Sequence, residues 1–281
     1  VVLHDKLMKP IIPPKYNISM ILLNTSMSLL EILEPWADIT YVDSSFDYEP
    51  YPLGHFKEIF TNDFYKSLCE EYPDVSELKI SEDKKKYNIN KFNKFSLTND
   101  HTEFSELLKR KKNFFNLYNF LNSREFFLKI SEILLKNNID LQLNFEKRGF
   151  LIKKRKYNLF FEFSSIPCDG GFILPHTDAP KKIMTFIVPI IKDTEKEIEN
   201  FKKVGTSILS MTDPKYSFNY FNRTMRLEET TEKKYVSFSP NKMLMFIKTH
   251  NSLHSVGPVE PLNDNIKFRN SITFAFRKNF D

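Results

Sequence analysis

The chain has 281 residues, of which 41% are hydrophobic and 15% aromatic, and its formal net charge at pH 7 is +5. This length and apolar content can bury a large core, so disorder throughout the chain is excluded. The basic clusters at 84–86, 109–112 and 153–156 are interleaved with acidic residues, a pattern of solvated faces that argues against nucleic-acid binding.

Cysteine usage and apolar runs indicate the compartment. Cys69 and Cys168 form no Cys-x-x-Cys pair and no secretory leader precedes them, so we expect neither a disulfide framework nor a zinc ribbon. We expect a reducing, cytoplasmic setting. The apolar stretch 18–30 is interrupted by polar residues and is too short to span a bilayer, so we expect no membrane segment. A first residue of valine leaves open whether the natural N-terminus is included.

Prolines and tyrosines dominate residues 1–55, which we predict to be an N-terminal extension, while residues 56–281 form one catalytic domain. Helices are expected across about 56–138. Thr61 is the expected cap of the first, which carries Phe64, Leu68 and Tyr72 on one face, and Ser123 is the expected cap of the last. Between them, 76–100 is predicted to be a polar connection, followed by a helical segment. That segment places apolar residues on one side: Phe104, Leu107, Leu108, Phe115 and Tyr118.

From about residue 139 the apolar period shortens to that of strands. Strands are predicted at 141–145, 157–163, 183–188, 242–247 and 268–276. The charged segments 192–203 and 212–234 are either a lid over a site or exposed linkers, and the pattern does not choose between them. Tyr41, Tyr48 and Tyr51, with the loop that holds Tyr216, Tyr220 and Arg223, are candidates for a substrate entrance.

A histidine and a carboxylate lie two positions apart in Phe172-Ile-Leu-Pro-His176-Thr-Asp178. On an extended backbone, residues i and i+2 point the same way, so His176 and Asp178 could reach one metal ion. The expected third ligand is His254, which lies in an apolar, strand-like run. His250 is the rival, but polar neighbours surround it. Two histidines and one carboxylate form the facial triad of non-haem Fe(II) oxygenases, which leaves open coordination positions.

A candidate anion site follows on a predicted strand. Arg269 and Ser271 alternate onto one face fifteen residues after His254, and apolar residues follow them. A guanidinium can hold a carboxylate through two parallel hydrogen bonds, and a hydroxyl can add a third.

Together, His176-x-Asp178, His254 and Arg269-x-Ser271 resemble the iron(II)- and 2-oxoglutarate-dependent dioxygenase superfamily, in particular its prolyl-hydroxylase-like branch. The resemblance covers about residues 157–276. It implies a mainly β fold with packing helices (α+β) around a double-stranded β-helix, or distorted jelly roll. It also implies Fe(II) on His176, Asp178 and His254, and 2-oxoglutarate on Arg269 and Ser271, with dioxygen as oxidant and ascorbate as an optional reductant.

The implied activity is that of a hydroxylase, an oxidoreductase that releases succinate and CO₂ while it hydroxylates a C–H bond. Its substrate would be a small molecule or peptide of prolyl, amino-acid or glycan type. The alternatives are a nucleobase dealkylase of the same superfamily and a catalytically silent binding module. Dealkylases carry a second arginine close behind the first, whereas Arg277 lies eight residues after Arg269. Neither the substrate nor the oligomeric state follows from the sequence.

Overall fold

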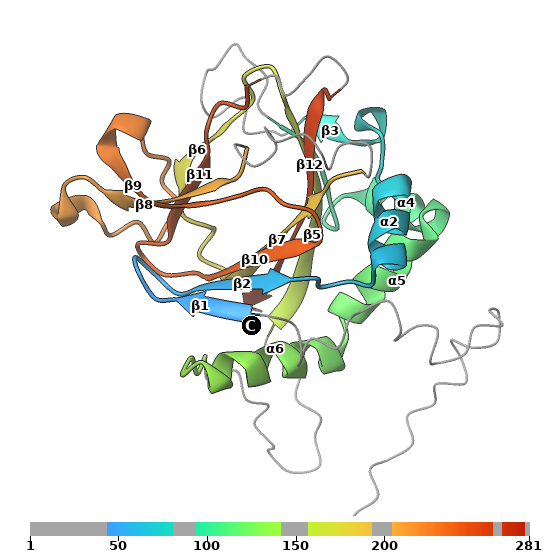
Figure 1. Ribbon diagram of the computed structural model, residues 1–281, viewed down its shortest axis with the longest axis horizontal. Coiled ribbons are helices and arrows are strands. Elements are labelled where there is room, and N and C mark those ends of the chain that lie inside the picture. The colour runs from blue at the N-terminus through green and yellow to red at the C-terminus, as the bar shows by residue number, and fades with distance from the viewer. Residues whose placement is uncertain (1–43, 81–93, 142–156, 193–203, 261–265, 279–281) are drawn as a thin grey trace, which may run out of the picture. The chain divides into compact units, whose positions relative to one another are not determined.

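The computed structural model describes residues 44–80, 94–141, 157–192, 204–260 and 266–278 (Figure 1). Its strands are β1 (Ser44–Asp47), β2 (Leu53–Lys57), β3 (Lys79–Ile80), β4 (Phe95–Thr98), β5 (Tyr157–Pro167), β6 (Ile173–His176), β7 (Lys182–Ile190), β8 (Thr206–Met211), β9 (Thr230–Val236), β10 (Lys242–Ile247), β11 (Leu253–Val256) and β12 (Phe268–Lys278). Its helices are α2 (Asn62–Glu71), α4 (Thr102–Arg110), α5 (Lys112–Leu121) and α6 (Arg124–Lys136), with short 3₁₀ turns at Val75–Glu77, Pro214–Tyr216 and Leu227–Glu229.

Two antiparallel sheets make up the β core. The large sheet has the order β1-β2-β10-β7-β12-β5-β4-β3, and the small sheet has the order β6-β11-β8-β9. From β5 to β12 the chain crosses repeatedly between the sheets, so that strands distant in sequence become neighbours. This is the topology of a jelly roll, or double-stranded β-helix. The predicted fold class is therefore confirmed.

Alternation along the central strands separates a helix-facing side of the large sheet from a cavity-facing side. On β12, Ile272, Phe274 and Phe276 belong to the main apolar cluster. Arg269, Ser271 and Thr273, at the intervening positions, line a cavity instead. The eleven-residue pairing of β12 with β5 fixes this register along its whole length. Polar residues of β12 therefore reach the cavity because its apolar residues are committed to the core.

The helices cover the outer face of the large sheet, on the side away from β6, β8, β9 and β11 (Figure 1). Phe126 of α6 lies with its ring centroid 5.9 Å from that of Phe274 and 6.2 Å from that of Phe186. Phe114 of α5 contacts Phe163 in an edge-to-face pair with 4.9 Å between centroids. The many phenylalanines thus supply the contact between helices and sheet, as large aromatic side chains do in cores.

The expected boundary at residue 55 falls inside β2. Residues 53–57 pair with β10 from Leu53↔Phe246 to Lys57↔Lys242, and β1 pairs in turn with β2. Residues 44–47 and 53–55, which we assigned to the extension, therefore lie in strands of the large sheet. The prolines that suggested irregular chain lie between these two strands, where Pro50 and Pro52 do not interrupt the pairing.

Most predicted elements are present. The strands at 157–163, 183–188, 242–247 and 268–276 are confirmed, and Ser123 caps α6 by accepting a hydrogen bond from the Phe126 amide at 3.1 Å. Of the strand expected at 141–145, only residue 141 is among the described residues. Residues 193–203 also lie outside them.

Four details differ. The segment 76–100, expected to be a polar connection, contains the short strands β3 and β4, which pair with each other. The helical segment expected after residue 100 is two helices, α4 and α5, and Phe115 is 47% exposed while Phe114 is buried. The segment 212–234, expected to be loop, contains the start of β9, which pairs with β8. Thr61 occupies the N-cap position of α2 without a capping side-chain hydrogen bond.

No helix among the described residues has the length and apolar character needed to cross a membrane.

Candidate metal centre

The backbone of the small sheet brings His176 and His254 together. His176 ends β6, and His254 on β11 is its direct partner across the two strands. Asp178 follows two residues after His176, beyond the end of the strand. A tight turn precedes β6: Gly170 has φ +98°, and a side chain at Gly171 would place its Cβ 2.5 Å from the Pro167 carbonyl oxygen. Glycines at these positions let the chain reverse before the metal-binding segment.

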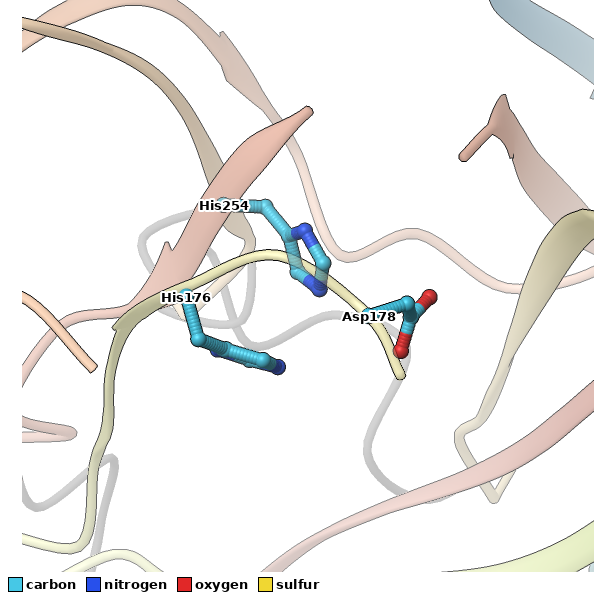
Figure 2. Close-up of side chains that lie close together, drawn as sticks. All are labelled: His176, Asp178 and His254. Carbon is cyan, nitrogen blue, oxygen red and sulfur yellow. The ribbon is translucent and has the colours of Figure 1, made fainter. Parts of the chain in front are cut away.

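The three side chains converge on one small region. One nitrogen of each imidazole and one carboxylate oxygen all lie within 4.8 Å of one another. Figure 2 shows both rings and the carboxylate turned toward the same space, with His176 and Asp178 on one segment and His254 on the neighbouring strand. This is the only such group of three or more histidine, cysteine or acidic residues in the described part of the chain. The set fits a divalent metal that accepts nitrogen and oxygen ligands.

Hydrogen bonds select the nitrogen that each imidazole offers. Nδ1 of His176 lies 2.8 Å from the Leu174 carbonyl oxygen, and Nδ1 of His254 lies 3.0 Å from that of Ser252. Because a carbonyl oxygen only accepts, each Nδ1 carries the proton and each Nε2 keeps a lone pair. Burial lowers the pKa of both imidazoles, that of His254 to about 3. Both rings are therefore neutral at pH 7, the form that binds metals.

Two residues of β7 orient the carboxylate of Asp178. Lys182 Nζ donates to Oδ1 at 2.6 Å, and Thr185 Oγ1 donates to Oδ2 at 2.5 Å. Burial is the largest influence and opposes ionisation, but the charge and hydrogen bond of Lys182 and the two neighbouring imidazoles together outweigh it, so the pKa of Asp178 lies below its ordinary value. Asp178 is therefore an ionised carboxylate whose direction is fixed by hydrogen bonds before any ligand binds.

Arg269 is buried on β12 with part of its guanidinium unsatisfied. Its Nε donates to the Val204 carbonyl at 2.5 Å, and its Cζ lies 4.0 Å from the centre of the Phe238 ring. Its Nη2 is buried and has no hydrogen-bond partner among the described residues. Burial lowers the pKa of Arg269 to about 10. A buried, unsatisfied cationic donor is costly, so this group fits an anionic ligand that completes its hydrogen bonds.

One cavity of about 90 Å³ connects these features. His176, Asp178 and His254 line it, and so do Arg269 and Ser271. The hydroxyl of Tyr72 lies 2.9 Å from the Ser164 carbonyl oxygen and 3.1 Å from that of Ser271, so its one proton is shared between β5 and β12. All five residues singled out from the sequence thus face one shared space.

The rival ligand and some entrance candidates lie elsewhere. His250 is exposed on the loop before β11, where its ring stacks on Phe218 with 5.6 Å between centroids. Tyr51, expected at the entrance, is buried in the core, with 1% of its surface exposed. Its ring packs at the edge of Phe246, and its hydroxyl donates to the Leu253 carbonyl. Tyr48 is exposed, and Tyr41 lies outside the described residues.

Sequence reasoning missed several residues that shape the cavity. Lys182 and Thr185 hold Asp178, Phe238 covers Arg269, and Lys94 forms an ion pair with Glu162 at 2.8 Å. Thr185 could have been found as a polar residue within an apolar strand. Nothing local marks Lys94 or Phe238, because their roles arise from long-range contacts.

No protein-family model matches the sequence, and no curated protein matches it. Solved structures do. A prolyl-4-hydroxylase from Pseudomonas putida is 14% identical with a TM-score of 0.47, over 83% of this chain and 96% of that one. A prolyl hydroxylase from Trichoplax adhaerens, solved with a hypoxia inducible factor peptide fragment, is 10% identical with a TM-score of 0.48, over 80% and 83%.

A prolyl 4-hydroxylase from Phytophthora capsici is 14% identical with a TM-score of 0.44. The match covers 80% of this chain and 58% of the Phytophthora protein, so the chain spans little more than half the length of that structure. The solved structures that this chain resembles thus include prolyl hydroxylases.

Proposed function

We propose that this protein is an Fe(II)- and 2-oxoglutarate-dependent dioxygenase. It hydroxylates a C–H bond of a prolyl or peptidyl, amino-acid or glycan-type substrate and releases succinate and CO₂. The observation that carries the proposal is the composition of one cavity, in which two histidines and a carboxylate converge and a buried arginine has an unsatisfied donor. A metal site alone would leave the arginine unexplained.

In this mechanism His176 and His254 would hold the iron through Nε2, and Asp178 would hold it through a carboxylate oxygen. The iron would supply open coordination positions for the keto acid and dioxygen. Lys182 and Thr185 keep the carboxylate of Asp178 in place, since each already donates a hydrogen bond to one of its oxygens. The two Nδ1–H bonds to carbonyls keep the imidazoles in the tautomer that the metal needs.

Arg269 would hold the far carboxylate of 2-oxoglutarate through Nη2, which has no hydrogen-bond partner among the described residues, and Ser271 would add a hydroxyl from the same strand face. Phe238 keeps water from the guanidinium on its other side. Phe246 lies 4.4 Å from the His254 ring, centroid to centroid, and gives the site an apolar wall. A dry wall strengthens the charge interactions inside the cavity.

Adding 2-oxoglutarate to the anaerobic Fe(II) protein tests the proposal. We expect a visible metal-to-ligand charge-transfer band, and we expect succinate to form when air is admitted. Asp178→Ala should lose both signals because it removes a ligand. Asp63→Ala, which removes an exposed carboxylate on α2, should keep both.

The other functions predict different results. A binding module would bind metal or 2-oxoglutarate without forming succinate under any condition. A dealkylase would respond to N-methylated nucleobases in single-stranded DNA and not to prolyl peptides, free amino acids or sugars. Absence of the band in the wild-type protein at saturating Fe(II) and 2-oxoglutarate would overturn the proposal itself.

A further inference from the structure

The side chains that line the cavity carry one more positive than negative charge, and the metal and 2-oxoglutarate together would not neutralise it. Its lining contains three cations, Lys94, Lys182 and Arg269, and two carboxylates, Glu162 and Asp178. The two histidines add no charge, since each Nδ1 donates to a carbonyl and each Nε2 would bind the metal as a lone pair. A metal dication and a 2-oxoglutarate dianion add equal and opposite charges. The loaded cavity therefore keeps one positive charge without a counter-ion from its own wall, and a buried charge requires a partner.

The unmatched charge belongs to Lys182. Lys94 is paired with Glu162 at 2.8 Å, with side chains 19% and 11% exposed. Arg269 is assigned to the cosubstrate. Lys182 bonds Asp178, but a metal ion would share that carboxylate and reduce its negative charge toward the lysine. Within the described part of the chain, the Lys182 ammonium also lies over the face of Phe160, 5.0 Å from Nζ to the ring centre, and this ring supplies no anion.

The sheet register separates Lys182 from the arginine. Lys182 pairs with Arg277 of β12, eight residues along the strand from Arg269. At about 3.3 Å per residue this is roughly 26 Å between the two backbone positions. Thr185, which bonds the metal-ligand candidate Asp178, pairs with Ala275 between them. In the proposed assignment both carboxylates of 2-oxoglutarate are already used, one by Arg269 and the other by the metal, so neither is reserved for Lys182.

A second lysine lies on the same side. Lys248 Nζ donates to the carbonyls of Thr249 and Asn219 at 3.1 and 3.5 Å, and it lies 5.3 Å from the ring centre of Tyr220. The Lys248 amide donates to the carbonyl of Ile183 at 2.9 Å, which places the backbone of Lys248 beside the start of β7, where Lys182 lies. The Tyr220 hydroxyl in turn contacts the Pro180 carbonyl at 3.4 Å, beside the segment that holds Asp178.

We propose that Lys182, assisted by Lys248, binds a carboxylate of the primary substrate. The substrate is then a carboxylate-bearing molecule, either a free amino acid or the C-terminal residue of a peptide, rather than an internal peptide residue or an uncharged sugar. This inference rests on the proposed function, since it assumes that the metal occupies Asp178 and that Arg269 holds 2-oxoglutarate. A charge-assisted hydrogen bond from an ammonium group provides the recognition.

Paired probes test it: free L-amino acids and N-acetyl-L-amino acids, each compared with its own carboxamide. The readouts are the change that a probe causes in the anaerobic charge-transfer band and the succinate formed in air. In the wild type, at least one carboxylate probe should bind roughly ten- to a hundred-fold more tightly than its carboxamide, as expected for a hydrogen bond to a charged group. The free and N-acetylated series distinguish an amino acid from a peptide end.

Variants assign the preference. Lys182→Gln should bring carboxylate and carboxamide to similar affinity, and Lys182→Arg should keep the preference because it keeps the charge. Lys248→Gln should reduce the preference less. Lys181→Gln removes the same charge at the adjacent exposed position and should behave like the wild type. The charge-transfer band with 2-oxoglutarate alone, measured on every variant, reports separately on the proposed function.

A normal band without any carboxylate preference in the wild type would overturn the inference and leave the proposed function standing. So would a preference that survives in Lys182→Gln, since Lys182 would then serve only to orient Asp178. If Lys182→Gln fails to bind iron, Lys248→Gln decides, because the contacts of its ammonium group are with carbonyls and a tyrosine ring rather than with a candidate ligand. An unchanged preference in that variant would also overturn the inference.

Discussion

At the residue scale, the candidate ligands are held by bonds that involve their other atoms. Each imidazole uses Nδ1 for a backbone carbonyl, and Asp178 is held by Lys182 and Thr185. Such support restricts each side chain before a metal binds, which is how proteins orient ligands and choose tautomers. The same support makes the contribution of each residue separable by substitution.

The first prediction concerns the choice between the two histidines near β11. His254→Ala should abolish tight Fe(II) binding, because the remaining histidine and carboxylate leave an incomplete site. His250→Ala should bind iron like the wild type, since His250 is exposed and stacks on Phe218 outside the cavity. Equilibrium dialysis with Fe(II), or with Mn(II) as a stable substitute, measures both variants. The reverse result would make His250 the ligand.

The second prediction concerns the anion site on β12. Arg269→Ala should weaken 2-oxoglutarate binding by roughly hundreds-fold or more, since breaking a buried ion pair costs about 3–5 kcal/mol. Ser271→Ala should cost less, about 1.5–3 kcal/mol for a hydrogen bond to a charged group. Titration of 2-oxoglutarate into the anaerobic Fe(II) protein measures both, and neither change should affect iron binding. Wild-type affinity in Arg269→Ala would show that another cation holds the cosubstrate.

At the element scale, the helices support the sheet from outside and the loops shape the mouth of the cavity. α6 buries Phe126, Phe127 and Ile130 against the large sheet, so its stability is coupled to that of the β core. The segment between β8 and β9 is hydrogen-bonded to the segment that holds His176 and Asp178. The Met225 amide donates to the Pro175 carbonyl at 2.8 Å, and Thr177 Oγ1 donates to the Asn219 carbonyl at 2.5 Å.

The third prediction tests the cap of α6. Ser123→Ala should lower the free energy of unfolding by about 1 kcal/mol, because the Phe126 amide loses its side-chain acceptor. Ser131→Ala is the matched control, since it makes the same chemical change inside the helix, where alanine is the better helix former. Urea unfolding followed by circular dichroism compares the two. Equal stability losses would show that capping is not the cause.

The fourth prediction concerns the aromatic residues of the loop before β9. Phe218 and Phe221 are 68% and 77% exposed, and the loop is bonded to the segment of His176 and Asp178. Replacing both with serine should leave folding and iron binding unchanged and reduce turnover of the true substrate, because exposed aromatics beside a site serve recognition. Leu135→Ser, at a 54% exposed position on α6, is the control. Unchanged turnover would remove this loop from substrate binding.

At the scale of the whole molecule, the candidate site joins distant parts of the chain. His176 and His254 are 78 positions apart and come from neighbouring strands, and Arg269 comes from the other sheet. A ligand that binds this folded arrangement and not the unfolded chain must stabilise the whole domain.

The fifth prediction follows from this linkage. A metal at a hundred times its Kd should add about 2.7 kcal/mol to the free energy of unfolding. For a domain of this size that corresponds to a rise in Tm of roughly 5–10 °C. Mn(II) with 2-oxoglutarate, under nitrogen, should give this shift in the wild type and in His250→Ala, and none in His254→Ala. Differential scanning fluorimetry measures it, and an equal shift in His254→Ala would point to binding elsewhere.

The sequence by itself predicted four of the central strands and the cap of α6, because alternation, helical periodicity and capping are local patterns. The mainly β class came from the resemblance to a known superfamily. The sequence also singled out the five residues that the fold brings to one cavity, since metal and anion ligands are polar residues at conspicuous places in apolar strands. Their roles in binding iron and 2-oxoglutarate stay predictions.

Only the tertiary structure decided the rest. That β1 and β2 extend the large sheet, that Tyr51 is buried, and that Lys182, Thr185 and Phe238 surround Asp178 and Arg269 all depend on pairing between segments far apart in the chain. The unmatched charge of Lys182 appears only when the residues around one cavity are counted together. Local sequence fixes which face of a strand a side chain occupies, whereas its partners are set by the sheet register and by the packing of the two sheets.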